Sequence, residues 1–194
     1  MIKSSDVKQL RLQTGAPMME CKRALEEADG DFRAAKNILK KRGQKIFEKK
    51  AGREAHEGVI ESYVHANGKI GVLVEVNCET DFVAKNPEFK AMAHEIAMQI
   101  AASNPKYIST LDVPEQELLN EREVMREMFK KEKKPAKILD KIINGKIQRY
   151  KEEISLLNQP LVRNPKKTVE ELIQEKTAKF GEKIIIKRFV RYEM

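Results

Sequence analysis

The feature that most constrains how this chain can fold is the dipeptide Asn67-Gly68, which lies between two β-rich runs of residues. An Asn-Gly pair in this setting is the strongest short-range signal for a β-hairpin that a sequence can carry. The second run, residues 70–76, is almost continuously apolar, which is typical of a strand covered on both faces. We therefore expect a hairpin whose second strand lies centrally in its sheet.

A helix is predicted shortly after the hairpin. Asn86-Pro87 supplies a cap and a first turn, and the apolar residues that follow recur at intervals of three and four. Such a stripe should pack on the hairpin, and its members are Phe89, Met92, Ala93, Ile96, Ala97 and Ile100.

Two further helical patterns come next. Residues 114–132 are highly charged with a narrow apolar face, and a Lys-rich turn ends at Pro135. Residues 138–154 again carry apolar side chains at helical spacing. We expect a helix on each side of the turn.

The end of the chain combines a helix with a strand. Thr168 and Glu171 make a capping box for a last helix that ends near Gly181. Residues 183–192 are predicted to form a strand that returns to the hairpin. Residues 57–194 are therefore expected to be an α+β core in which a small antiparallel sheet packs against helices.

Residues 1–43 predict a compact module of three short helices. A Lys-rich segment, residues 44–56, has few large apolar side chains and is expected to be a linker, with partial helix left open. The predicted starts and stops in the module are Ser4 or Ser5 to Gly15, Pro17 to the residue before Asp29, and Asp31 to Gly43.

The positive charge of the chain is divided between its two ends. There are 38 Lys and Arg against 30 Asp and Glu, a formal net charge of +8. Residues 1–56 and 135–194 each carry 14 basic and 8 acidic side chains, whereas the middle is slightly acidic. A nucleic-acid binder should gather its charge on one element and offer aromatic rings to the bases, and this chain has no Trp. Solvated Lys-rich helix faces are the favoured interpretation, with no direct binding to nucleic acid.

Several kinds of chemistry lack their signature residues. Cys21 and Cys78 have no further Cys or His at ligand spacing, which excludes a disulfide framework and a local zinc site. No glycine-rich phosphate loop or His-Glu-x-x-His motif occurs, and no pattern links the three histidines. Cys78 is either a nucleophile or, more simply, a small buried filler. We expect no enzyme activity, no cofactor and no bound metal.

The sequence also lacks the apolar runs that are typical of membrane-spanning and secretory segments. No apolar run approaches the roughly 18 residues needed to cross a bilayer, and the first residues lack the apolar stretch of a secretory signal. We expect a cytoplasmic protein without a membrane partner.

Two segments are more specific than composition, namely TGAPMMECKRALEEADGD at 14–31 and VEVNCETDFVAKNPEF at 74–89. They resemble the translation elongation factor Ts family, the first its N-terminal ubiquitin-associated-like module and the second its core. KIINGKIQRYKEEISLLNQPLV at 141–162 is similar to the C-terminal part of that core. Longer members carry two copies of the core unit and a protruding coiled-coil insert. This chain has room for one copy and resembles the short form.

The resemblance implies a guanine-nucleotide exchange factor that binds elongation factor Tu, displaces Mg²⁺ and GDP, and allows GTP to bind. Thr80, Asp81, Phe82 and Val83 match the motif that reaches the GTPase, where the Phe inserts beside the magnesium and phosphate site. Asp81 and Phe82 are the favoured contact residues. From the residues alone, the core is the favoured place for Phe82, and it is the match to the motif that favours an exposed contact. Val83 is expected to be core, and Thr80 could serve only to cap the turn.

Met18 and Met19 match the contact that the N-terminal module makes with the same GTPase. Adjacent residues on a helix point about 100° apart, so one of the two should be exposed. Flexible thioethers suit an adaptable contact surface, but core filling is an equal alternative for Met18.

Oligomeric state and partner class leave alternatives open. A single core copy should expose a sheet edge and an apolar patch, so we expect a homodimer near the hairpin and the last strand, with Ile184, Ile186 and Phe189. A monomer whose edge is masked by residues 114–132 is the rival. An RNA-associated binding protein is the alternative function, and its binding would fall steeply with salt.

Overall fold

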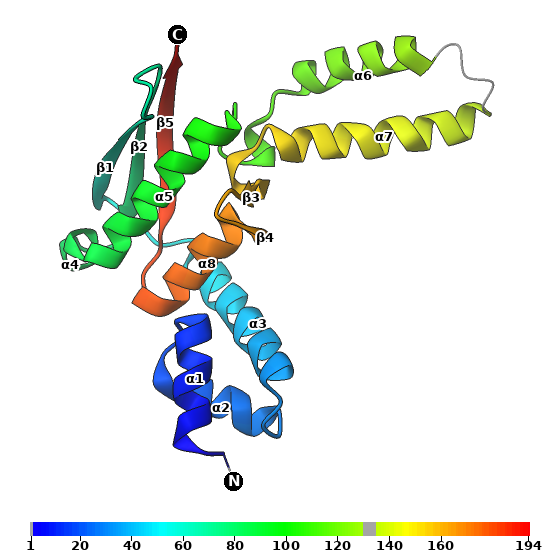
Figure 1. Ribbon diagram of the computed structural model, residues 1–194. Helices are drawn as coiled ribbons and strands as arrows, with labels where there is room; N and C mark the ends of the chain where they lie inside the picture. The colour runs from blue at the N-terminus through cyan, green and yellow to red at the C-terminus, as the bar shows by residue number, and fades with distance from the viewer. Residues whose placement is uncertain (1, 130–134) are drawn as a thin grey trace.

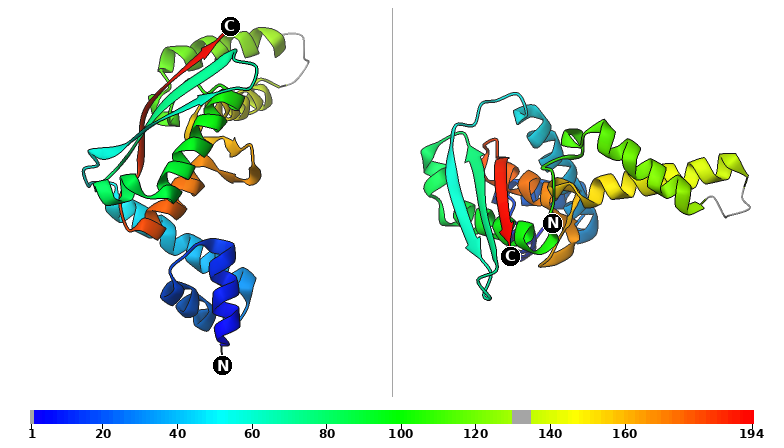
Figure 2. Two further views of the ribbon diagram at one scale, coloured as in Figure 1. Left: turned by 60° about the vertical axis from the view of Figure 1, so that its left-hand side comes forward. Right: turned by 90° about the horizontal axis from the view of Figure 1, so that it is seen from above.

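The computed structural model describes residues 2–129 and 135–194 (Figure 1). Three N-terminal helices lead into a body in which helices cover a small antiparallel sheet, and a helical pair projects from that body (Figure 1 and Figure 2). The expected α+β fold with an N-terminal helical module is confirmed. Within the described residues, no helix combines the length and the apolar character that crossing a membrane requires.

The sheet is built on the predicted hairpin. β1 (Glu57–Val64) and β2 (Ile70–Cys78) are antiparallel, and β5 (Ile185–Glu193) pairs antiparallel with the other side of β2. In the turn, Gly68 has a φ of 68°, and its N–H donates to the carbonyl of His65 at 2.7 Å. The hairpin, the central place of β2 and the return of the last strand are confirmed.

Helix α5 (Pro87–Ser103) covers one face of the sheet (Figure 1). Its side chains along the predicted stripe are all buried, and Asn86 caps it by accepting a hydrogen bond from the N–H of Glu88 at 2.8 Å. Every second residue of β2 turns towards α5 and is buried in the same core, namely Val72, Val74 and Val76. The stripe and its packing on the hairpin are confirmed.

The opposite face of the sheet is open, so the expectation that β2 is covered on both faces is wrong. Leu73 is 47% exposed and Ile60 is 69% exposed. The register places side chains of all three strands beside them on this face. We call the resulting apolar surface the open sheet face, and it consists of Ile60, Val64, Leu73, Val190 and Tyr192.

The residues named for a dimer contact do not lie on this surface. Ile184 and Ile186 are buried in the main core of the chain itself, and Phe189 is half-buried against that core. The reason is the strand register, because Ile186 pairs with Val76 and shares its inward direction.

The N-terminal helices are α1 (Ser4–Thr14), α2 (Met18–Glu27) and α3 (Phe32–Lys50). Gly15 ends α1 with a φ of 68°, as predicted. The N-cap of α1 is Lys3 rather than Ser4 or Ser5, because the Asp6 carboxylate accepts from the Lys3 N–H at 3.4 Å.

Helix α3 begins at the predicted cap, where Asp31 accepts from the N–H of Arg33 at 2.7 Å. The predicted end of this helix at Gly43 is wrong, because α3 continues to Lys50. Phe47 packs against the main core, and α3 runs alongside Ala178, whose Cβ would lie 3.7 Å from a Cβ added at Gly43. Tertiary packing therefore outweighs the cost of about 1 kcal/mol for glycine in a helix, and the first part of the Lys-rich segment is helical.

The projecting pair, which we call the arm, consists of α6 (Glu115–Phe129) and α7 (Ala136–Glu153), as predicted (Figure 2). The Lys-rich turn predicted between them falls largely on residues 130–134, outside the described residues. Helix α6 packs on α7, away from the sheet, and not over a sheet edge as the monomer alternative required.

The base of the arm is fastened by one carboxylate. Lys106 donates to Glu117 at 2.8 Å, and the hydroxyls of Tyr107 and Tyr150 donate to it at 2.6 and 2.8 Å. These hydrogen bonds lower the pKa of Glu117 to about 2, so it stays ionised near neutral pH.

After the arm come β3 (Pro160–Leu161) and β4 (Asn164–Thr168), a small hairpin that was not predicted. Helix α8 (Val169–Phe180) follows, with the predicted capping box at Thr168 and a stop at Gly181. Short 3₁₀ turns at Thr110–Asp112 and Leu156–Asn158 complete the described elements.

Substituting Gly58 in β1 should destabilise the fold. A Cβ there would lie 2.2 Å from the Val76 carbonyl oxygen, and its φ of 154° is open mainly to glycine. We expect Gly58→Ala to lower the free energy of unfolding by about 2 kcal/mol or more, measured by urea denaturation. Gly71→Ala is the matched control, because a Cβ on Gly71 would have no neighbour within 4 Å. Equal effects of the two changes would contradict this account of Gly58.

Candidate functional site

The motif singled out by sequence lies where β2 ends. Thr80 is still extended, with φ −128° and ψ 155°, and a five-residue helix, α4 (Asp81–Lys85), begins directly after it. Asn86 then ends α4 and caps α5. The motif is thus a short helix held between a central strand and the main core helix.

Helix α4 turns one large apolar side chain outwards. Phe82 is 84% exposed, whereas Val83 is half-buried against the main core and Ala84 is buried. The N–H of Ala84 donates to the Thr80 carbonyl at 3.2 Å, and the N–H of Asn86 donates to the Val83 carbonyl at 3.0 Å. The position of Phe82 therefore follows from the burial of its neighbours. A core place for Phe82 is excluded, and the expected core place for Val83 is supported.

Asp81 forms an ion pair with Lys85 one helical turn away, at 2.6 Å. The hydrogen bond from Lys85 lowers the pKa of Asp81, and Asp81 raises that of Lys85. Both side chains are substantially exposed, so the pair contributes little to stability. It leaves an oriented carboxylate beside the exposed ring.

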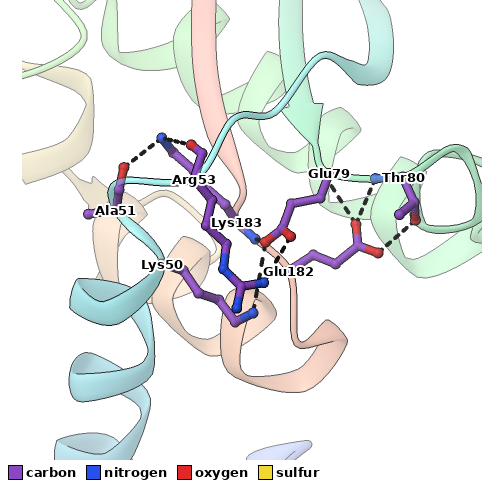
Figure 3. A network of polar contacts seen from close by, with 7 residues as sticks. All are labelled: Lys50, Ala51, Arg53, Glu79, Thr80, Glu182 and Lys183. Carbon is purple, nitrogen blue, oxygen red and sulfur yellow. Dashed lines mark hydrogen bonds and ion pairs between the residues drawn. The ribbon is translucent and has the colours of Figure 1, made fainter.

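Contrary to expectation, the Thr80 side chain does not cap the turn but bonds to a distant segment. Its hydroxyl donates to Glu182 at 2.6 Å and makes no capping bond to its own helix. The same carboxylate accepts the backbone N–H of Thr80 at 3.0 Å and that of Glu79 at 3.2 Å (Figure 3). Glu182 lies in the turn between α8 and β5, so two distant segments meet at the motif.

A second carboxylate, that of Glu79, bonds in the opposite direction, to the segment that contains Glu182. Glu79 accepts the backbone N–H of Lys183 at 2.5 Å and the Arg53 guanidinium at 3.0 Å, and it lies 3.8 Å from Lys50 (Figure 3). Partial burial raises the pKa of Glu79, but the bonds from Lys183 and Arg53 outweigh it and the pKa is lowered overall. We call the reciprocal contact between Glu79-Thr80 and Glu182-Lys183 the clasp.

The clasp also reaches the end of α3. The ammonium group of Lys183 donates to the carbonyls of Ala51 and Arg53 at 2.7 and 2.6 Å (Figure 3). Sequence reasoning did not identify Glu79, Glu182 or Lys183 as part of the site. No local pattern could have done so, since the contacts join residues more than 100 positions apart.

The two methionines of the N-terminal module differ in burial. Met19 is 57% exposed, and Met18 is half-buried against the small core of the module. Met18 therefore fills the core, and Met19 is the exposed residue of the pair. Helix α2 and helix α4 lie on separate parts of the molecule (Figure 1), so the structure does not bring the two expected contact regions together.

Side chains that could ligate a metal do not converge in the described part of the chain. No cluster of three or more His, Cys, Asp or Glu side chains there could hold a metal ion. His94 of α5 lies 2.9 Å from Glu61 of β1 on the surface. The motif instead presents an exposed phenyl ring on a short helix.

Cys78 is a buried filler and not a nucleophile. Its side chain is fully buried, and its thiol donates to the Thr80 carbonyl at 3.2 Å. Burial, together with the nearby charge of Glu182, raises the pKa of Cys78 to about 11. Since the thiolate is the reactive form, this thiol is inert near neutral pH.

Both cysteines should resist modification while the protein is folded. Cys21 is also fully buried, and burial raises its pKa. We expect a chromogenic disulfide reagent at pH 8 to detect neither thiol quickly in the native protein and both in guanidinium chloride. Rapid reaction of one native thiol would contradict the assignment of both as structural.

Comparisons with known proteins extend along the whole chain. A family model described as "Elongation factor TS" matches residues 19–194. The chain is 53% identical over 194 residues to an elongation factor Ts of Carboxydothermus hydrogenoformans, covering 100% of this chain and 89% of that protein. It is 50% identical over 194 residues to that of Moorella thermoacetica, with 100% and 96% covered. It is also 52% identical over 193 residues to that of Coprothermobacter proteolyticus, with 100% and 98% covered.

Proposed function

This chain belongs to the elongation factor Ts family, and from that premise we propose that it promotes guanine-nucleotide exchange on elongation factor Tu during translation. In this proposal it binds the GTPase, displaces Mg²⁺ and GDP, and leaves the site open to GTP. The work is done by binding alone, with no covalent chemistry and no cofactor.

The observation that carries the proposal is the exposure of Phe82. Phe82 is 84% exposed while the next residues of its helix, Val83 and Ala84, turn towards the core, so the ring packs little against its own chain. Buried aromatic anchors dominate the energetics of protein contacts. Phe82 is therefore our choice for the residue that enters the GTPase beside its magnesium and phosphate site, with Asp81 next to it and Thr80 and Val83 as its support.

The physical basis of exchange is coupled binding. A factor that prefers the nucleotide-free GTPase must weaken nucleotide affinity by the same ratio by which nucleotide weakens its own binding. Loss of the Mg²⁺ that neutralises the phosphates is an efficient way to weaken that affinity. A rigid wedge that meets the GTPase only in the nucleotide-free arrangement provides the required preference.

The N-terminal module would add a second contact through Met19. Its exposed thioether is flexible enough to fit an irregular apolar surface. The excess of 14 basic over 8 acidic side chains in residues 1–56 would attract an acidic GTPase surface and raise the encounter rate. Some of this charge is already paired, since Arg42 bridges Glu20 and Glu27 at 2.9 and 2.7 Å.

Replacing Phe82 tests the proposed wedge. We expect Phe82→Ala to lower the rate at which elongation factor Tu releases labelled GDP by about tenfold or more, measured at a saturating concentration of this protein. The melting temperature should barely change, because the ring is exposed. Asp81→Ala should have a milder effect.

Val83→Ala is the matched control, since Val83 packs against the core. Val83→Ala should lower the free energy of unfolding by about 1 kcal/mol. It should reduce exchange activity less than Phe82→Ala does. A stability loss of about 3 kcal/mol in Phe82→Ala, typical of a lost core Phe, would show that the wedge assignment is wrong.

We further propose that the protein is a homodimer that uses the open sheet face. This surface gathers Ile60, Leu73 and Val190 from three adjacent strands around the Glu75–Arg188 ion pair, and exposed apolar side chains grouped in this way mark interfaces. A two-fold axis through the face would let the same surface cover itself.

Light scattering at micromolar concentration tests the dimer. We expect a mass of twice the 22.3 kDa of one chain, and a single-chain mass for Leu73→Lys, which places a charge in the centre of the face. Leu111→Lys is the control, because Leu111 is exposed in the 3₁₀ turn before the arm. A single-chain mass for the unsubstituted protein, unchanged on concentration, would refute the dimer.

A further inference from the structure

We propose that Glu182 is a positioning residue for nucleotide exchange, which holds Thr80 so that α4 presents Phe82 in the direction that the GTPase contact needs. The inference rests on the proposed function and adds a residue to it. Glu182 lies outside the motif and 102 positions from Thr80.

The first support is the number of bonds that one carboxylate makes at one place. One oxygen of Glu182 accepts the N–H groups of Glu79 and Thr80 at 3.2 and 3.0 Å, and the other accepts the Thr80 hydroxyl at 2.6 Å. Hydrogen bonds to an ionised acceptor are roughly twice as strong as neutral ones. The backbone between β2 and α4 is thus fixed by a charged group from another segment.

The second support is the shortness of α4. An isolated helix of five residues is not stable in water, so the direction of Asp81–Lys85 must be imposed from outside. At its C-terminal end Asn86 joins it to α5, and on its inner side Val83 and Ala84 enter the core. At its N-terminal end Glu182 supplies the corresponding restraint.

The third support is that removal of the Glu182 side chain would leave residues 79–80 and 182–183 in contact. Glu79 returns a bond to the Lys183 N–H at 2.5 Å, and Lys183 reaches the carbonyl of Ala51 at 2.7 Å. These contacts would persist without the Glu182 side chain. We therefore expect loss of Glu182 to loosen residues 79–85 while the overall fold remains.

The experiment compares Glu182→Ala with Glu182→Gln in the full-length protein. The amide of Gln keeps an oxygen that can accept both N–H groups, and its NH₂ can donate to the Thr80 hydroxyl. Glu54→Ala is the control for lost charge, because Glu54 lies in the same region, is 86% exposed and does not contact the motif. Labelled-GDP release from elongation factor Tu and amide hydrogen exchange of residues 79–85 in the free protein are measured for each.

We expect Glu182→Ala to reduce the maximal rate of GDP release by about tenfold, with a smaller change in the factor concentration that gives half the effect. Amide exchange over residues 79–85 should become faster, and the melting temperature should remain close to that of the unsubstituted protein. Glu182→Gln should restore both the release rate and the protection. Adding Thr80→Val to Glu182→Ala should cause little further loss, because both changes remove the same bond.

An unchanged release rate in Glu182→Ala would overturn the proposal, as would a loss of activity without faster amide exchange at residues 79–85. An equal loss in Glu54→Ala would assign the effect to charge and also overturn it. These outcomes differ from failure of the proposed function, in which the unsubstituted protein itself would not accelerate GDP release.

Discussion

The packing of α5 on the inner face of β2 is the contact on which the rest of the molecule depends. It brings Val74 and Val76 of β2 and Phe89 and Ile96 of α5 into one buried apolar core, whose burial stabilises the body of the molecule. Because α4 lies between β2 and α5 in the chain, this contact anchors the segments on either side of the motif, and the bonds to Glu182 hold its N-terminal end. The exposed ring of Phe82 thus lies on a short segment that joins two elements of the buried core.

Elements with local signals could be predicted from the sequence. The Asn67-Gly68 turn, the cap at Asn86 and the stop at Gly181 each depend on residues close by, and the structure has all three. Elements governed by distant contacts could not. The apolar run of β2 does not reveal that one face stays open, and Gly43 gives no sign that α8 supports the helix through it.

The candidate site divides in the same way. Its motif was identified through the family resemblance, but the outward direction of Phe82 was not decided by spacing, because a Phe near a strand end usually lies inside a protein. Which of Met18 and Met19 is exposed needed the packing of the module. Glu182 had no signal at all, since a carboxylate after a helix stop is ordinary and its partners come from the other half of the chain.

The continuity of α3 through Gly43 to Lys50 has a consequence for how the length of this chain can vary. An α-helix rises about 1.5 Å and turns about 100° with each residue. One residue inserted in its exposed part would therefore swing the whole N-terminal module to another side of the body while shifting it only slightly. Insertions should be tolerated in the turns of the module but not within α3. The number of residues in this helix sets the direction in which Met19 points relative to Phe82.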